Sequence, residues 1–142
     1  MPEVRYPDGV KQLLEHARVI AVLGAHPQRT RAAFYVPDYL VQQGYRILPV
    51  NPTRVGEILW GEPVRASLTD IDEPVDVVDV FRRSAALMGH LDEIRSMKPL
   101  PQWVWLQQGI RDDTFAAHLM DVGIAVVQDR CMLADHRRLK TG

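Results

Sequence analysis

Polar and charged side chains follow five short apolar segments of this chain, and the first group of them is suited to binding phosphate. The segment VIAVL ends at Gly24, and the loop after it carries His26, Arg29 and Arg31 before an apolar stretch resumes. A helix N-terminus attracts anions through free N–H groups and its dipole, and arginine adds a planar fork of donors. We therefore predict an anion site in which His26 and both arginines contact phosphate. The alternatives are solvated arginines and a loop histidine with a backbone partner.

Four later apolar segments also end in polar or glycine residues. They are residues 45–50, followed by Asn51-Pro52; 75–81, followed by Arg82-Arg83; 102–107, followed by Gln108-Gly109-Ile110; and 124–129, followed by Arg130-Cys131. Continuous runs rich in valine and isoleucine are typical of strands covered on both faces of a parallel sheet. Because parallel strands all end at one edge, we expect these polar residues to gather there, with Arg82 facing the ligand.

Amphipathic stretches that could form helices alternate with these segments. They cover residues 9–17, 32–44, 84–97 (with Ser84 as N-cap), 112–123 and 132–140, whereas residues 52–72 show no regular pattern. Strands that alternate with helices indicate right-handed βαβ units. We predict an α/β fold: a Rossmann-like, doubly wound parallel sheet of about five strands flanked by helices in three layers. Such sheets bind ligands at the carboxyl ends of the strands, where the strand order reverses.

The composition places the chain among small globular proteins and excludes several classes. Its 142 residues are 46% hydrophobic and 25% charged, which predicts one domain over residues 1–142. A net charge of -1 argues against nucleic-acid binding. No apolar run approaches the roughly 20 residues that a membrane helix needs, so we expect no membrane association. Cys131 is the single cysteine, which excludes an internal disulfide and favours a cytoplasmic location.

The first loop does not fit the common nucleotide-binding motifs. A dinucleotide fingerprint needs G-x-G-x-x-G, and after Gly24 this chain has Ala25 and then His26 in place of the second glycine. The acidic residue expected after the second strand is replaced by Asn51-Pro52. The chain also has no G-K-[ST] phosphate loop, no G-x-S-x-G nucleophile motif and no His or Cys pair at metal-ligand spacing. We therefore assign no catalytic and no metal-binding residue.

Several segments resemble the stand-alone CoA-binding family. They are IAVLGAHPQRTRAAFYVPDYLVQQGYRILPVNP, VDVVDVFRRSAAL, VWLQQGI and GIAVVQDRCM, which lie in the family's order between residues 13 and 138. These proteins are small and Rossmann-like, and they are similar to the CoA-binding domain of the succinyl-CoA synthetase alpha subunit. The resemblance implies coenzyme A as the ligand, bound across the carboxyl edge of the sheet. Many members carry a lysine early in the first loop, where this chain has Pro27-Gln28, and Arg29 is the candidate substitute.

The resemblance also implies where the parts of coenzyme A would lie. The phosphates would lie at the loop from Gly24 to Arg31, and the pantetheine arm would run toward residues 108–110. The adenine and ribose would lie near residues 50–52 and 81–82. The complete set of expected contacts is Gly24, Ala25, His26, Arg29, Arg31, Val50, Asn51, Pro52, Phe81, Arg82, Gln108, Gly109 and Ile110.

We expect a binding module for CoA or acyl-CoA that has no catalysis of its own. The alternatives are a subunit of a CoA ligase or transferase that acts with a separate partner, and an NADP-type nucleotide binder that uses the arginines. Self-association or an unidentified protein partner stays open.

Four further residues have a structural and a functional interpretation. Asp79 lies inside an expected buried strand, so we expect it to accept hydrogen bonds from backbone or arginine. Cys131 is either a small apolar core residue or a thiol that reacts with CoA or accepts an acyl group. Trp103 and Trp105 point to the same side of a strand and are expected to pack in the core. Phe81 is expected there too, with the lining of an adenine pocket as the alternative.

Overall fold

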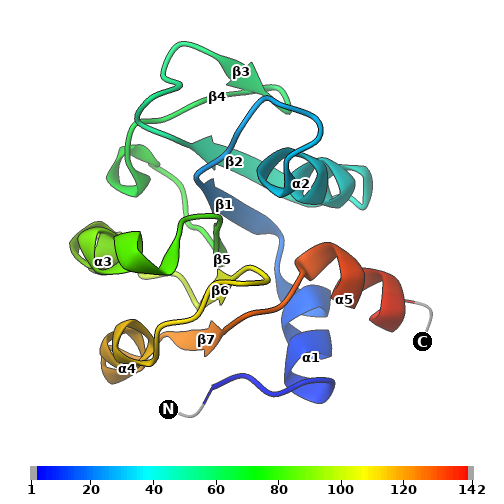
Figure 1. Cartoon of the computed structure of the whole chain (residues 1–142), viewed down its shortest axis with the longest axis vertical. Helices are drawn as coiled ribbons and strands as arrows, with labels where there is room; N and C mark the ends of the chain where they lie inside the picture. Colours follow the sequence, from blue (N-terminus) through cyan, green and yellow to red (C-terminus); the bar gives the residue numbers. More distant parts are fainter. Residues whose placement is uncertain (1–2, 141–142) are drawn as a thin grey trace.

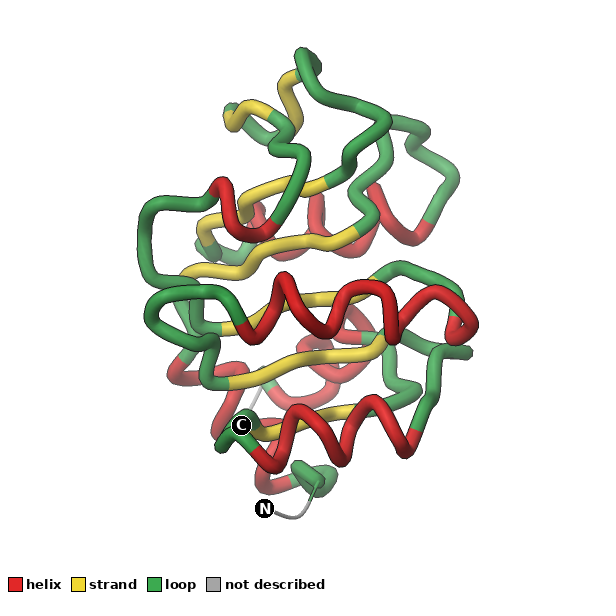
Figure 2. The backbone as a smooth tube through the Cα atoms, turned by 90° about the vertical axis from the view of Figure 1, so that its left-hand side faces the viewer, coloured by secondary structure: helices red, strands yellow, loops and turns green. Residues whose placement is uncertain are grey.

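The computed structural model describes residues 3–140 and has a five-stranded parallel sheet at its centre (Figure 2). The strands are β1 (Val19–Leu23), β2 (Arg46–Val50), β5 (Val77–Val80), β6 (Trp103–Leu106) and β7 (Ala125–Val127). Their order is β2-β1-β5-β6-β7, and every neighbouring pair is parallel. The predicted doubly wound α/β fold is confirmed, and each strand is one to three residues shorter at its ends than the sequence pattern indicated.

Helices cover both faces of the sheet and make three layers (Figure 1). On one face lie α1 (Asp8–His16), α2 (Ala32–Gln42) and α5 (Met132–Leu139); on the other lie α3 (Leu91–Arg95) and α4 (Asp113–Asp121). Successive side chains of a strand point to opposite faces. Ile20 and Val22 of β1 therefore pack against α1, α2 and α5, whereas Ala21 and Leu23 pack toward α3 and α4. Trp103 and Trp105 share the first of these two cores, as predicted.

The single helix predicted over residues 84–97 is wrong in its first half. Ser84–His90 form a 3-10 helix, and the α-helix begins only at Leu91. Ser84 does not cap a helix, because its Oγ accepts a hydrogen bond from the backbone N–H of Arg111 at 3.2 Å. Gly89 is a poor helix former, and Asp92 and Glu93 favour a helix that starts just before them.

The stretch with no regular pattern, residues 52–72, contains a small hairpin and a 3-10 turn. Strands β3 (Ile58–Leu59) and β4 (Glu62–Pro63) pair antiparallel through Trp60 and Gly61. Both turn residues have positive φ, 53° and 77°, as a tight type I′ hairpin requires. The segment after the hairpin joins the edge of β2, since the N–H of Arg65 donates to Pro49 O at 3.1 Å and Asn51 donates to Arg65 O at 2.9 Å.

The strand order reverses between β1 and β5. From β1 the chain passes through α2 to β2 on one side, and it later returns to place β5 on the other side of β1. The connections after β1, β5 and β6 consequently lie beside one another near the middle of the view in Figure 1. This is the place where doubly wound sheets bind ligands. Within residues 3–140, no helix is long and apolar enough to span a bilayer.

Candidate functional site

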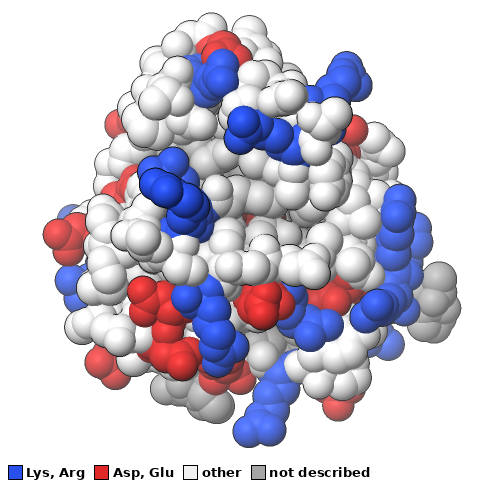
Figure 3. Space-filling view, in the orientation of Figure 1, with Lys and Arg blue, Asp and Glu red and all other residues white. Residues whose placement is uncertain are grey.

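A cavity of about 640 Å³ opens at the carboxyl edge of the sheet, where the strand order reverses. It is lined by Arg31, Ala32, Ala33, Tyr35, Val36, Phe81, Arg82, Arg83, Ser84, Gln107, Gln108, Gly109, Ile110 and Cys131. Figure 3 shows this face of the molecule with a pale hollow in its middle and basic side chains around it. A smaller hollow of about 360 Å³ lies between α1 and α5, but none of the predicted contacts lines it. The cavity at the strand ends is therefore the candidate site.

Gly24 lets the loops after β1 and β5 touch. Its φ is +92°, and a Cβ at this position would lie 3.0 Å from the carbonyl oxygen of Phe81 and 3.2 Å from Cδ of Arg82. Only glycine adopts this conformation readily, and only glycine leaves room for the neighbouring backbone. The first glycine of the loop thus fixes the spacing of the two strand ends that border the cavity.

Val50 and Asn51 hold the first loop from the side of β2. The N–H groups of Gly24 and Ala25 both donate to Val50 O, at 2.9 and 3.3 Å. Asn51 Nδ2 donates to Ala25 O at 2.9 Å, while its Oδ1 accepts from the backbone and hydroxyl of Thr53. Ala25 and Val50 are fully buried. The structure therefore places these residues in the support of the loop, beside the cavity, and Pro52 is exposed just beyond them.

Each ring nitrogen of His26 lies within hydrogen-bond distance of a donor that belongs to another residue. Its Nδ1 accepts from the N–H of Gln28 at 3.1 Å, and its Nε2 lies 3.1 Å from Nη2 of Arg54. Burial and the charges of Arg31 and Arg54 lower the pKa of His26, so the ring is neutral and carries one proton. A neutral imidazole accepts at only one ring nitrogen, whereas the Gln28 N–H and the Arg54 guanidinium are both donors, so His26 accepts from one of them and faces the other with its own N–H. An anion beside the ring would accept from the donors that are left.

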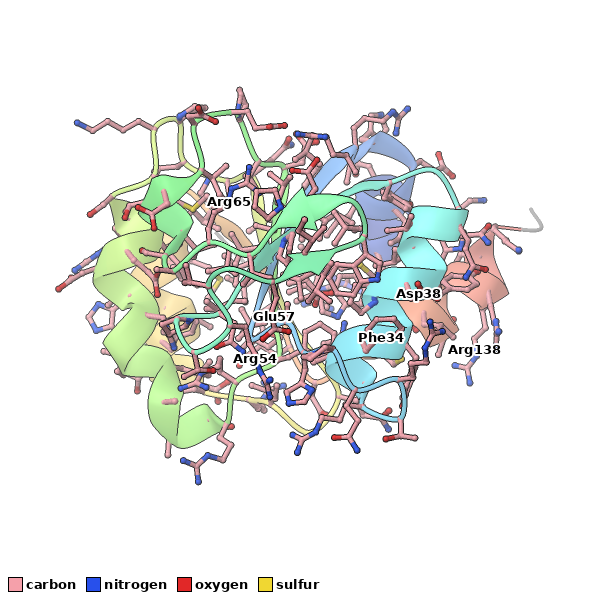
Figure 4. The ribbon with its side chains drawn as sticks, turned by 90° about the horizontal axis from the view of Figure 1, so that it is seen from above. Phe34, Asp38, Arg54, Glu57, Arg65 and Arg138 are labelled. Atoms are coloured by element: carbon pink, nitrogen blue, oxygen red, sulfur yellow. The ribbon has the colours of Figure 1, made fainter. Side chains whose placement is uncertain are left out.

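Arg54 was missed by the sequence analysis. It lies in the turn after β2, and its guanidinium is 3.5 Å from the carboxylate of Glu57. Both residues are labelled in the view from above (Figure 4). The same view shows Phe34 between the β3–β4 hairpin and the start of α2. The sequence did hold a signal for Arg54, because it lies three residues beyond Asn51 in a turn that was predicted to lie at the carboxyl edge.

Three arginines line the cavity, and none of them has a carboxylate partner within residues 3–140: Arg31, Arg82 and Arg83. Arg31 Nε donates to the side-chain oxygen of Gln28 at 3.0 Å, and Arg82 Nε donates to His90 Nε2 at 3.3 Å. Their charges create a positive potential at this edge, although the whole chain has a net charge of -1. Arg29 lies outside the cavity, with its guanidinium 5.5 Å from the ring centre of Phe34.

Gln107 also lines the cavity, beside the end of β5. Gln107 Nε2 donates to Oδ1 of Asp79 at 2.9 Å, and burial raises the pKa of Asp79 to about 7. The predicted backbone or arginine partner of Asp79 is therefore wrong, because an amide side chain fills that place. The loop that follows is held by Asp129, whose Oδ1 accepts from the N–H of Gly109 at 2.6 Å.

Cys131 and Phe81 are both partly exposed at the cavity wall. Phe81 also packs against the core that contains Trp105, as predicted, and its place in an adenine pocket stays a prediction. Cys131 is half-buried: it packs against the core that contains Trp105, and it also lines the cavity. No group of three or more residues that could hold a metal ion occurs in residues 3–140.

The sequence pattern of the family described as "CoA binding domain" matches residues 18–137 of this chain. The chain belongs to the CoA binding domain family. The uncharacterized protein YneT of Bacillus subtilis (strain 168) is similar to it, with 35% identity over 128 residues, which cover 89% of this chain and 91% of YneT.

Solved structures with the same fold are similar to this chain in sequence and in structure. The structure of cell-free ID.343 from Thermus thermophilus is 52% identical with a TM-score of 0.88, and the match covers 92% of this chain and 96% of that one. A hypothetical protein from Pyrococcus horikoshii OT3 is 31% identical with a TM-score of 0.84, and 99% of each chain is covered. The family and the fold that the sequence motifs indicated are confirmed.

The predicted contacts of this CoA binding domain fall into two groups. Those that line the cavity are Arg31, Phe81, Arg82, Gln108, Gly109 and Ile110. Those that lie along the same edge without lining it are Gly24, Ala25, His26, Arg29, Val50, Asn51 and Pro52. The assignment of all of them to a ligand stays a prediction. Besides Arg54, the structure adds Gln107, Arg83 and Ser84, which the sequence patterns did not single out as contacts.

Proposed function

We propose that this protein binds coenzyme A, free or acylated, at the carboxyl edge of its sheet, and that it acts as a binding module without a reaction of its own. Membership of the CoA binding domain family supports the choice of ligand. The observation that carries the proposal is the cavity itself, whose lining combines three arginines that have no carboxylate partner within residues 3–140 with neutral side chains. Coenzyme A likewise combines phosphates with a neutral arm.

The diphosphate is proposed to lie against Arg31, Arg82 and the first turn of α2. The backbone N–H groups of Ala32 and Ala33 open this helix at the cavity wall, and neither donates to another group in the described part of the chain. Free N–H groups at a helix start and arginine forks both suit phosphate oxygens. The ribose phosphate would lie farther along the edge, beside the His26 ring and the Arg54 guanidinium.

The neutral parts of the ligand are proposed to occupy the two ends of the edge. The adenine would lie near Asn51, Pro52 and Phe81, and the pantetheine arm would run past residues 108–110. Cys131 lines this second end, so the thiol or acyl group of the ligand would come to rest close to its side chain. The thiol of Cys131 makes no hydrogen bond within residues 3–140, and no base activates it there. This supports binding in preference to catalysis.

Isothermal titration with CoA, acetyl-CoA, NADP⁺, NAD⁺ and ATP tests the proposal. We expect CoA and acetyl-CoA to bind most tightly, with an affinity that falls as salt is raised, because phosphate–arginine contacts are screened. Arg31→Gln and Arg82→Gln should each weaken CoA binding about tenfold, the effect of one charge-assisted hydrogen bond. Arg5→Gln, an exposed arginine near the N-terminus, is the matched control and should bind like the wild type. A preference for NADP⁺, or no binding of CoA, would overturn the proposal.

A further inference from the structure

A buried carboxyl group lies directly beneath the cavity. Asp79 is in the middle of the sheet, opposite Val22 of β1 and Trp105 of β6, and its side chain has no exposure to solvent. Oδ1 accepts the hydrogen bond from Gln107, but Oδ2 has no partner within residues 3–140. A buried polar atom without a partner is costly, so the retention of a carboxyl group here needs a reason.

The contact with Asp79 fixes which end of the Gln107 amide faces the cavity. A carboxyl oxygen accepts hydrogen bonds, so the NH₂ group of the amide must point toward Asp79 and its Oε1 must point away. Oε1 accepts no hydrogen bond within the described part of the chain, and it is not sealed from solvent. Since the side chain of Gln107 lines the cavity, its wall presents one oriented, neutral acceptor.

Oε1 of Gln107 differs in its hydrogen-bonding character from the other groups that line the cavity. The same lining carries the donors of Arg31, Arg82 and Arg83, and the side chains of Ile110 and Val36 in it are apolar. A neutral acceptor in such a place is suited to a neutral N–H group of the ligand. It has nothing to offer a phosphate, which is itself an acceptor.

We infer that Oε1 of Gln107 accepts a hydrogen bond from an amide N–H of the pantetheine arm, and that Asp79 is the positioning residue that keeps the Gln107 amide in this orientation. The inference rests on the proposed function, because it names the part of the same ligand that this wall recognises. Without Asp79 the amide is free to turn about its last torsion, whose barrier is low. Half of its orientations would then place NH₂ where the ligand's own donor arrives.

The experiment compares CoA with adenosine 3′,5′-bisphosphate, which has phosphates but lacks the pantetheine arm. Gln107→Met keeps the length of the side chain and removes the acceptor. We expect it to weaken CoA binding about three- to tenfold, the net effect of one neutral hydrogen bond, and to leave the bisphosphate affinity unchanged. Gln102→Met is the matched control, because Gln102 is an exposed glutamine at the other end of the same strand segment, and it should change neither affinity.

Two substitutions of Asp79 test its positioning role. Asp79→Asn retains an oxygen that can accept from Gln107, so it should keep the wild-type ratio of the two affinities. Asp79→Leu removes that oxygen and should lower CoA affinity about twofold, less than Gln107→Met does, because half of the amide orientations stay competent; the bisphosphate affinity should not change. A general loss of structure would weaken both ligands together and leave their ratio unchanged, so the ratio separates positioning from folding.

The outcomes distinguish this inference from the proposal on which it rests. If the wild-type protein binds no CoA, the proposed function fails. If the wild type binds CoA and Gln107→Met leaves the ratio of CoA to bisphosphate affinity unchanged, the function stands and the inference is overturned. Should Asp79→Leu not fold, Gln107→Met and Asp79→Asn still decide the matter.

Discussion

Replacing Asp79 by asparagine should make the stability of this protein much less dependent on pH. The carboxyl group is fully buried, and burial raises its pKa from 3.8 to about 7. Between these two pH values the folded state holds a proton that the unfolded state has released, so the stability of the wild type falls as pH rises through this window. Asparagine carries no charge at any of these pH values, yet it can still accept the hydrogen bond from Gln107.

The magnitude follows from the size of the displacement. At 1.36 kcal/mol for each pH unit, a pKa moved from 3.8 to about 7 corresponds to at most about 4 kcal/mol of stability lost by the time Asp79 is ionised. A domain of this size is stable by only about 5–15 kcal/mol, so the effect is a large fraction of the total. The ionised carboxylate keeps its hydrogen bond from Gln107, which holds the loss below its full desolvation cost.

Urea unfolding at pH 5 and at pH 8 measures this effect. We expect Asp79→Asn to gain stability relative to the wild type on going from pH 5 to pH 8, by about 2–3 kcal/mol, because about two pH units of the window lie above pH 5. Asp121→Asn, at the exposed end of α4, is the matched control, and its difference from the wild type should be the same at both pH values. Equal differences for Asp79→Asn at the two pH values would refute the reasoning, as would an NMR titration that places the pKa of Asp79 near 4.

Further substitutions test the backbone that shapes the site. Gly24→Ala should lower the free energy of unfolding by about 1–3 kcal/mol, because φ is +92° and the new Cβ meets Phe81 O; thermal unfolding measures this, and a neutral effect would contradict the close contact. Asp129→Ala should destabilise by about 1–3 kcal/mol through the lost acceptor of the Gly109 N–H and a φ of 57°, whereas Asp129→Asn should cost less in the same assay. Equal losses for these two variants would exclude the hydrogen bond as the cause.

Local patterns predicted the sheet well, because each of its strands is covered on both faces. Runs such as VIAVL and WVWL stay apolar without alternation, which is typical of such strands, and the glycine or polar residue after each run marks the carboxyl edge. Of the spaced residues that predicted a helix over residues 84–97, Leu91 and Ile94 lie in α3 and only Leu87 lies in the 3-10 half. Ser84, the predicted N-cap, instead contacts Arg111, which is distant in sequence.

The residues of the candidate site could likewise be predicted only where their role depends on the local sequence. Gly24, Arg31 and Arg82 could be found from the sequence because Gly24 and Arg82 come just after strand ends and Arg31 comes just before a helix. Gln107 could not be assigned a role, because its orientation depends on Asp79, which belongs to a different strand and is 28 residues away. The hairpin of β3 and β4 was missed because each of its strands has two residues, too few to show a period.

The contact between the loops after β1 and β5 has a consequence for how a ligand would change the motions of the protein. The chain continues from the loop after β1 into α2 and β2, and from the loop after β5 into α3 and β6. The pair β1–β5 therefore joins the two separately wound halves of the sheet. A ligand held by Arg31 and Arg82 would tie these halves together at their open edge. Hydrogen exchange of the amides that link β1 to β5 should then slow more than exchange at the β6–β7 pair, with an added protection of about 2.7 kcal/mol at a ligand concentration 100-fold above Kd.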